Sequence, residues 1–278
     1  MTSNNAADSV PDWPLAYGKL VPPLVGGIRF EYTHRVLAAL VSVMTLTLAV
    51  WLMKAEKRPL ARKLGWTALG LVIAQAILGG IRVLEGHPAI SATAHAILAQ
   101  VFFLTIVGLS LYLSPWWQRD LPQYEEGTSG ARAFAFWTTI AILVQLVMGA
   151  AFRHGAFGIA PHLVGAGVVT VMVVMTGRAV KYNFRNVPDL RRGVALLHSF
   201  FGIQILLGGA AYWAVLKAGD NFQPTLGYVL LTVAHVLGGA LLLAASVLLT
   251  LSCYRLIHPA SSVADSSGAH LAGRTTAG

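Results

Sequence analysis

The sequence predicts an all-α protein: a polytopic transmembrane helical bundle built from two pseudo-symmetric halves. Two observations place the chain in a membrane. Apolar residues make up 56% and charged residues 11% of the 278 residues, and the mean hydropathy is +0.66, whereas a soluble domain carries about 25% charged residues. The chain also divides into apolar runs of about 20 residues, the length that crosses a bilayer as helix. A third observation, a repeated motif, predicts the two halves.

The apolar runs predict seven spanning helices, because a helix satisfies its own backbone hydrogen bonds in lipid. They lie at about 33–53, 64–82, 92–114, 132–152, 161–180, 193–215 and 225–252. We therefore expect an outer amino-terminal segment (1–30), first-half helices (31–115), an inner linker loop (116–131), a second-half four-helix bundle (132–255) and a tail (256–278). The tail is rich in Ser, Ala and Gly, a composition typical of disorder.

The net charge of +9 is explained by its placement. With the amino terminus outside, fourteen basic residues fall on the inner side and six on the outer side. This bias follows the positive-inside rule, so it indicates orientation in a lipid bilayer and no nucleic-acid partner. Cys253, the only cysteine, allows no disulfide and no cysteine metal site.

A motif recurs near the ends of three runs: Gln, three residues, Gly and then a small residue. It is found at 75–80, 145–150 and 204–209. After each copy come an outer loop and a run that carries a histidine. One copy alone could be ordinary helix packing, since small residues allow close approach in membranes. Three copies in phase indicate an internal repeat.

Four histidines lie on alternate runs, His34, His95, His162 and His235, and the last three each follow a copy of the motif. Alternate helices start on the same face of the bilayer, so all four imidazoles are expected toward the outer face. Histidine inside a membrane is costly unless it is paired, hydrogen-bonded or ligating. Each one alone could bond a neighbouring helix, and imidazole suits iron, copper and zinc alike. Two pairs in register favour axial ligation of haem over a closed zinc site.

The repeat is incomplete, because no Gln-bearing run precedes His34. Either the first unit lacks a helix, or the sequence begins downstream of the natural start. An added amino-terminal helix would place that terminus inside. It would also remove the need to export about 30 residues that carry no signal peptide.

Glu31 distinguishes the two halves. It lies three residues before His34, so both share one helix face, whereas Ile159 and Thr232 occupy the equivalent positions before His162 and His235. The carboxylate could orient the imidazole or act on a substrate. The alternative is an interfacial carboxylate paired with Arg35 or Arg29.

Four arginines near the outer ends of the runs oppose the inside bias. Arginine can hold a haem propionate in a bidentate pair, or it can extend to the interface. The candidates are Arg29, Arg35, Arg82 and Arg153. Among the other histidines, His198 is expected in packing, and His87 and His154 are expected in outer loops, either solvated or gating substrate entry. His258 and His270 lie in the tail.

The sequence resembles the haem A synthase family over roughly residues 10–255. The resemblance rests on Pro11-Asp12-Trp13-Pro14, Gly18 and Pro22-Pro23, on Glu31-Tyr32-Thr33-His34-Arg35, and on the three later histidines. It implies an eight-helix bundle of two related halves in the cell (inner) membrane. It also implies oxidation of a ring methyl of haem O to the formyl group of haem A.

The resemblance also implies roles for the histidines. His34 and His95 would frame the haem O site, with Glu31 as the catalytic carboxylate, while His162 and His235 would ligate a permanent haem b that passes in electrons. The implied partners are haem O, an unidentified electron donor, haem O synthase and the terminal oxidase. The chain departs from the family in lacking the first helix and the loop cysteine pair, in whose place it has Val10 and Ala16.

Two other functions compete with this hypothesis. A di-haem b electron-transfer cytochrome would need the same histidines, but it has no use for an acid beside only one pocket. A transporter could also contain repeats and polar residues within the membrane. Against it, the runs lack a helix strongly broken by Gly and Pro, and the histidines lie toward one face.

Overall fold

The computed structural model describes residues 9–86, 88–217 and 224–259. Seven helices in this part of the chain have the length and apolar composition needed to cross a membrane, which confirms the predicted bundle. They are α1 (Ile28–Ala55), α2 (Pro59–Leu84), α3 (Ala89–Leu113), α5 (Ala131–Arg153), α6 (Ala160–Phe184), α7 (Pro188–Lys217) and α8 (Leu226–Leu256). Five of these helices extend beyond the predicted spans at both ends, by one to five residues, whereas α3 and α8 extend at one end only.

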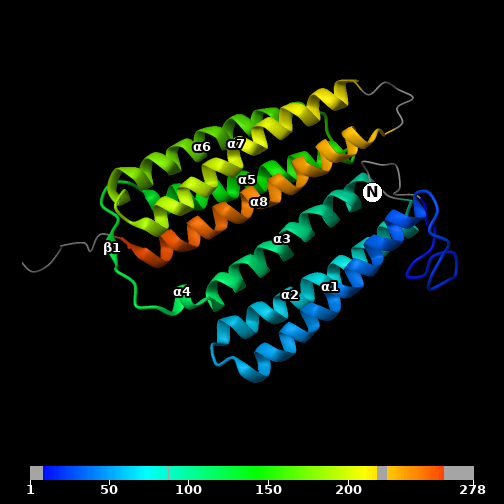
Figure 1. Cartoon of the computed structure of the whole chain (residues 1–278), viewed down its shortest axis with the longest axis horizontal. Coiled ribbons are helices and arrows are strands. Elements are labelled where there is room, and N and C mark those ends of the chain that lie inside the picture. Colours follow the sequence, from blue (N-terminus) through cyan, green and yellow to red (C-terminus); the bar gives the residue numbers. More distant parts are fainter. Residues whose placement is uncertain (1–8, 87, 218–223, 260–278) are drawn as a thin grey trace, which may run out of the picture.

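The helices run alternately up and down and form two groups (Figure 1). Helices α1, α2 and α3 form one group, and α5 to α8 form the other. Helix α3 also packs against α5 and α8, so it joins the groups. Helices α1, α3, α6 and α8 all begin at one end of the bundle, which we call the histidine end.

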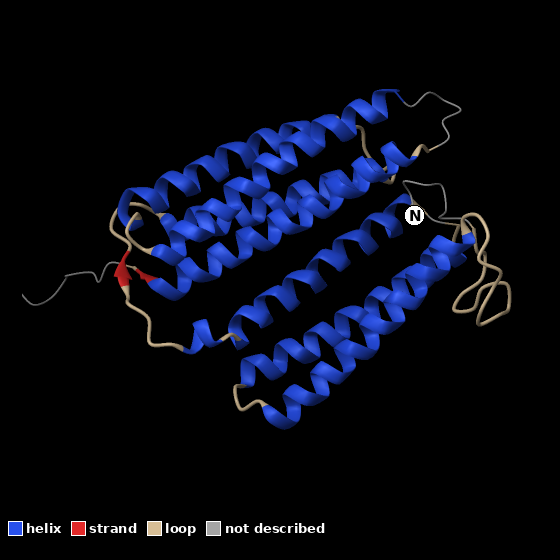
Figure 2. Ribbon diagram, viewed as in Figure 1, coloured by secondary structure: helices blue, strands red, loops and turns tan. Residues whose placement is uncertain are grey.

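Three short elements lie at the opposite end, which we call the basic end (Figure 2). Helix α4 (Pro115–Gln118) and strand β1 (Tyr124–Glu125) occupy the linker between the groups, and strand β2 (Ile257–His258) follows α8. The two strands pair in parallel, so the start of the expected tail is anchored to the linker. The remainder of that tail, 260–278, lies outside the described residues.

Local chemistry ends α1 and starts α2. Glu56 accepts hydrogen bonds from the backbone and side chain of Arg58, and Arg58 also donates to the carbonyl of Tyr112 on α3. The hydrogen bond from Arg58 lowers the pKa of Glu56 to about 2. Pro59 then occupies the first turn of α2, where its missing N–H costs no hydrogen bond. The turn is thereby fixed to α3.

The second group has the larger buried core. Its apolar centre includes Ile142, Val173, Leu197 and Leu243, whereas the buried cluster of the first group is small. Hydroxyl groups also join its helices: Thr138 bonds Thr176 at 2.6 Å, and Thr139 bonds Ser246 at 2.7 Å. Such interhelical hydrogen bonds contribute about 0.6 kcal/mol each in membranes.

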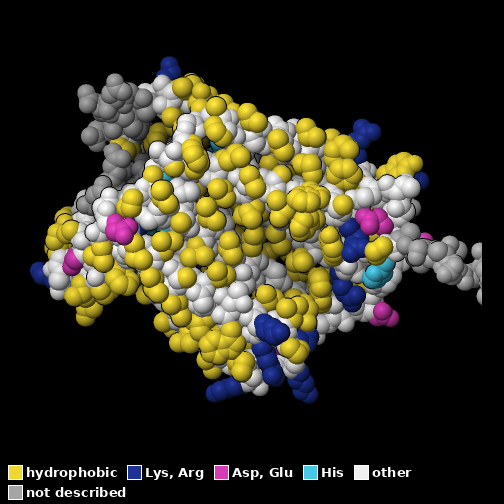
Figure 3. All heavy atoms as spheres, turned by 180° about the vertical axis from the view of Figure 1, so that it is seen from behind, with side chains coloured by type: hydrophobic (Ala, Val, Ile, Leu, Met, Phe, Trp, Pro, Cys, Tyr) yellow, Lys and Arg dark blue, Asp and Glu magenta, His cyan; other side chains and the backbone are white. Residues whose placement is uncertain are grey.

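The surface agrees with a membrane-embedded bundle (Figure 3). Hydrophobic side chains cover most of the face shown, and many Lys and Arg side chains gather toward the basic end. Large apolar residues such as Val43, Met44, Val171 and Leu206 are exposed along the helices, where lipid would contact them. The chain is therefore an integral membrane protein.

Candidate functional site

The three glutamines of the repeat make the same hydrogen bond. Nε2 of Gln75 donates to the backbone carbonyl of His95 at 3.0 Å. Gln145 donates to the carbonyl of His162 at 2.8 Å, and Gln204 donates to the carbonyl of His235 at 3.0 Å. Each bond joins a glutamine helix to the histidine helix that follows it, so the glutamine sets the depth of the histidine.

The glycines of the repeat make room for the imidazoles. A Cβ atom added to Gly79 would lie 3.2 Å from Cε1 of His95. For Gly149 against His162 the distance would be 2.9 Å, and for Gly208 against His235 it would be 3.0 Å. A larger residue would therefore displace each ring. The predicted repeat is a helix pair in which Gln holds the backbone and Gly receives the side chain of one histidine.

Two further glycines belong to the site and were not singled out from the sequence. Gly165 and Gly238 lie three residues after His162 and His235, and a Cβ at either position would collide with Oε1 of Gln145 or Gln204. The signal was available as His-x-x-Gly in both second-half units. Leu98 occupies the matching position after His95, so this feature is confined to the second group.

His162 and His235 face each other across a pocket. Their ring centroids are 6.2 Å apart and their planes stand at 89°. Both imidazoles line the same pocket, and imidazole is a common ligand of iron. The two rings are therefore placed to hold one group from two different helices.

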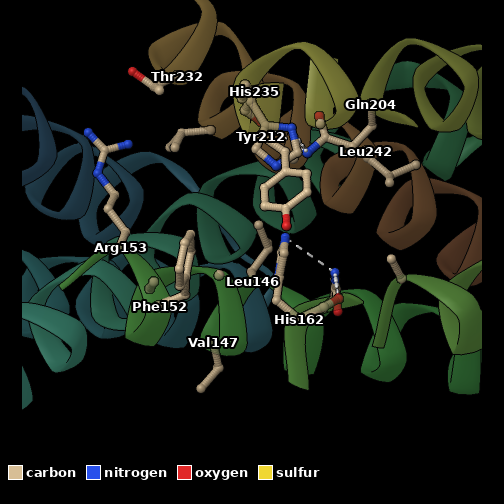
Figure 4. A pocket seen from close by; sticks show the side chains of 18 of the residues that line it. Leu146, Val147, Phe152, Arg153, His162, Gln204, Tyr212, Thr232, His235 and Leu242 are labelled. Carbon is tan, nitrogen blue, oxygen red and sulfur yellow. Dashed lines mark hydrogen bonds between the residues drawn. The ribbon is translucent and has the colours of Figure 1, made fainter. Parts of the chain in front are cut away.

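The pocket that both rings line has a volume of about 700 Å³ (Figure 4). Its walls are mostly apolar, and Leu146, Phe152 and Leu242 are among the residues around the two imidazoles. Arg153 lines it too, interacts with Tyr228, and is placed to meet an anionic group. A large flat ligand with acidic substituents matches this lining, which supports axial haem ligation.

Helix α3 of the first group also lines this pocket, through Ala96, Ile97 and Gln100. Oε1 of Gln100 is buried and has no hydrogen-bond partner among the described residues. His95 precedes Ala96 directly and interacts electrostatically with His34. One helix thus serves both groups.

The first-group histidines lie in a different setting. Glu31 is only 1% exposed, and its Oε1 forms an ion pair with Arg35 at 2.7 Å. The predicted alternative, an ion pair of Glu31 with Arg35, is therefore present. His34, one turn later, is exposed on the bundle surface, while His95 is partly buried. Within the described residues no Gln donates to the His34 carbonyl, which matches the incomplete repeat.

The four arginines have separate surroundings. Arg35 also donates to three backbone carbonyls of the segment that precedes α1, those of Asp12, Pro14 and Leu15. Arg29 lies over the ring of Phe30. Arg82 acts electrostatically on His34 and His95. Arg82 therefore belongs to the first-group site and Arg153 to the second.

His154 connects the two sites at the histidine end. It caps α5, lines the second-group pocket and interacts with Arg82 of α2. Burial, followed by the charges of Arg82 and Arg153, lowers its pKa to about 4, so it is neutral at pH 7. His154 is thus part of the pocket lining and not a fully solvated loop residue.

The remaining histidines lie away from both sites. His198 bonds the carbonyl of Val194 at 2.8 Å and packs over Gly177. His258 belongs to β2, and His87 and His270 fall outside the described residues. No group of three or more His, Cys, Asp or Glu side chains suited to a metal ion comes together in the described part of the chain.

Comparison with known proteins identifies the family of this chain. The family model described as cytochrome oxidase assembly protein, COX15-CtaA, matches residues 28–264. A heme A synthase from Exiguobacterium sp. is 25% identical over 242 residues, covering 80% of this chain and 78% of that protein. The chain belongs to the haem A synthase family. No solved structure matches it significantly.

Two other members of the haem A synthase family illustrate the range of similarity. The heme A synthase of Symbiobacterium thermophilum is 24% identical over 239 residues, covering 75% of this chain and 77% of that protein. The heme A synthase of Alkalihalophilus pseudofirmus is 37% identical over 106 residues, which is 34% of either chain. The similarity to the first of these members extends over both helix groups.

Proposed function

We propose that this protein is a haem A synthase that oxidises a ring methyl of haem O to the formyl group of haem A. The haem A formed would be supplied to the assembly of a terminal oxidase. The observation that carries the proposal is the difference between two related sites. Both groups present a histidine pair at one end of the bundle, but only the first group has a buried carboxylate, Glu31, one turn from a histidine.

The second-group pocket is proposed to hold haem b. His162 and His235 would hold its iron, because their rings lie close together and line one pocket. When bound, haem b supplies single electrons to the reaction. Arg153 would hold a propionate, and Gly149 and Gly208 leave room for the ligand rings.

The first-group site is proposed to bind haem O as substrate. His34 and His95 would frame the porphyrin, and Arg82 would meet a propionate. Glu31 retains one buried oxygen, Oε2, without a hydrogen-bond partner among the described residues. This acceptor supports a role in taking a proton from the substrate group, because a positioned carboxylate is a common general base.

The proposed orientation places the histidine end outside and the carboxyl terminus in the cytoplasm of a cell (inner) membrane. The gathering of Lys and Arg at the basic end supports it. The proposed partners are haem O synthase as the source of substrate, an electron donor of unknown identity, and terminal oxidase assembly as the destination of the product.

The deciding experiment is conversion of haem O by the purified protein in nanodiscs with a chemical reductant and oxygen. Extracted haem is separated by chromatography. Wild-type protein is expected to form haem A. The Glu31→Gln protein is expected to retain haem b but to form no haem A. Stable haem b in both proteins with no conversion in either would instead favour the di-haem electron-transfer cytochrome.

A further inference from the structure

The motif Pro11-Asp12-Trp13-Pro14 has no assigned task in the proposed function. It lies in the segment Val10–Gly18, which precedes α1 and which we call the capping segment. Val10 is fully buried and Ala16 is 2% exposed, so the segment is anchored to the protein. Its contacts lead to the first-group site.

Asp12 organises the capping segment. Its Oδ1 accepts the backbone N–H of Tyr17, and its Oδ2 accepts that of Gly18, both at 2.7 Å. Tyr17 and Gly18 have positive φ angles of 54° and 67°, a conformation that is uncommon for a residue such as Tyr17. The carboxylate compensates by satisfying both amides, so this turn depends on Asp12.

The folded turn presents three carbonyl groups to one nitrogen. Nη1 of Arg35 donates to the carbonyl of Asp12 at 2.8 Å, and also to the carbonyls of Pro14 and Leu15. Nη2 of the same guanidinium donates to Oε1 of Glu31 at 2.7 Å. Arginine can serve both directions at once because its planar group carries several fixed donors.

Trp13 brings the same segment to the second histidine of this site. A Cβ atom added to Gly80 would lie 2.7 Å from Cδ2 of the indole, and one added to neighbouring Gly79 would meet His95. The adjacent glycines of α2 thus receive Trp13 and the imidazole. The capping segment therefore contacts the surroundings of both Glu31 and His95.

We propose that the capping segment is the positioning element of the haem O site, in which Asp12 acts through Arg35 to hold the Glu31 carboxylate against the substrate. This rests on the proposed function. Arg35 then serves Glu31 and not a haem propionate, and the Asp-Trp-Pro motif is explained by the shape of the turn that it makes.

Turnover at saturating haem O tests the proposal. Asp12→Ala is expected to lower kcat about ten- to a hundredfold, since a misplacement near 1 Å costs about that much, while KM changes less than about threefold. Arg35→Lys, which keeps the charge but lacks the fork of donors, should behave similarly. Lys19→Gln, just beyond the segment, is the matched control and should retain wild-type turnover.

A double-mutant cycle separates positioning from general loss of structure. If Asp12 acts through Arg35, the variant carrying both Asp12→Ala and Arg35→Gln should be no slower than Arg35→Gln alone, because residues in one network are not additive. Losses that multiply would overturn the proposal. The haem b spectrum should be unchanged in every variant. If Asp12→Ala loses this spectrum, Asp12→Asn takes its place in the cycle.

A measurement without substrate separates failure of this proposal from failure of the proposed function. Carbodiimide labelling of Glu31, read by mass spectrometry, should be slow in the wild type, where the side chain is 1% exposed. It should be faster in Asp12→Ala and Arg35→Gln, and unchanged in Lys19→Gln. Equal labelling in all four proteins would overturn the proposal whether or not haem A forms.

Discussion

The imidazole rings of His162 and His235 stand at 89° to each other with their centroids 6.2 Å apart. His162 lies on α6, and His235 lies on α8, 73 residues later in the chain. Replacing either ring with His162→Ala or His235→Ala should remove the haem b absorption of the purified protein, because one axial ligand is lost. His198→Gln, in packing contacts away from the pocket, is the control. Full haem in both alanine variants would refute the ligand assignment.

Gly208 should be far less tolerant of substitution than Gly202 on the same helix. A Cβ at Gly208 meets His235 at 3.0 Å, whereas a Cβ at Gly202 has nothing within 4 Å and Gly202 does not line the pocket. Overpacking costs about 1–3 kcal/mol, so Gly208→Val should weaken haem binding about 5- to 150-fold. Haem titration of the apoprotein measures this. Equal affinities of the Gly208→Val and Gly202→Val proteins would contradict the assigned contact.

Removal of a repeat glutamine should cost modest stability and disturb its histidine. Gln145→Leu deletes the 2.8 Å bond to the His162 carbonyl, for which about 0.6–1.7 kcal/mol is expected in a membrane bundle. Thermal unfolding in detergent gives the stability, and the haem spectrum reports the ligand. Gln123→Leu, in the linker, should change neither. If Gln145→Leu changed neither the thermal stability nor the haem spectrum, the hydrogen bond would not be what sets the depth of His162 in the membrane.

Glu31→Gln should keep haem b and stop haem A formation in cells that supply haem O. The amide preserves the volume of the side chain but cannot take a proton. The fall should be about 10²- to 10⁴-fold, the usual contribution of a general base. If these cells made haem A at wild-type levels, Glu31 would not be the general base of the reaction. Glu56→Gln, in the α1–α2 turn, serves as the control.

The capping segment should open in acid. The backbone N–H groups of Gly18 and Tyr17 lower the pKa of Asp12 below its ordinary value of 3.8. A carboxyl whose folded pKa is depressed stabilises the fold above its unfolded pKa, and this contribution disappears as pH falls through the folded value. Hydrogen exchange at Tyr17 and Gly18 should therefore show protection near pH 5 that is lost below about pH 3.8. Asp12→Asn should remove most of that dependence.

Periodicity predicted the bundle well, because each span is a continuous apolar run bounded by charged or loop residues. The repeat also predicted real contacts: Gln75, Gln145 and Gln204 each reach the next histidine helix. These features follow from spacing along single helices. Spacing is readable in the sequence whatever the tertiary arrangement.

The capping segment and the strand pair could not be predicted in the same way. The path of Val10–Gly18 depends on Asp12 meeting backbone amides and on carbonyls converging on Arg35, and neither produces a periodic pattern. The pairing of Tyr124 with Ile257 joins residues from distant parts of the chain. The role of Gly165 becomes clear only when Gln145 is seen to lie against it. Such contacts depend on the folded arrangement.

Helix α3 contributes residues to the sites of both helix groups. It carries His95 for one site, while Ala96, Ile97 and Gln100 form a wall of the other. A fragment cut to residues 131–258 would keep both histidines of the second-group pocket, His162 and His235, and yet expose one side of that pocket to lipid. Dissection into the two halves that the repeat suggests would remove the wall that α3 gives to the second-group pocket.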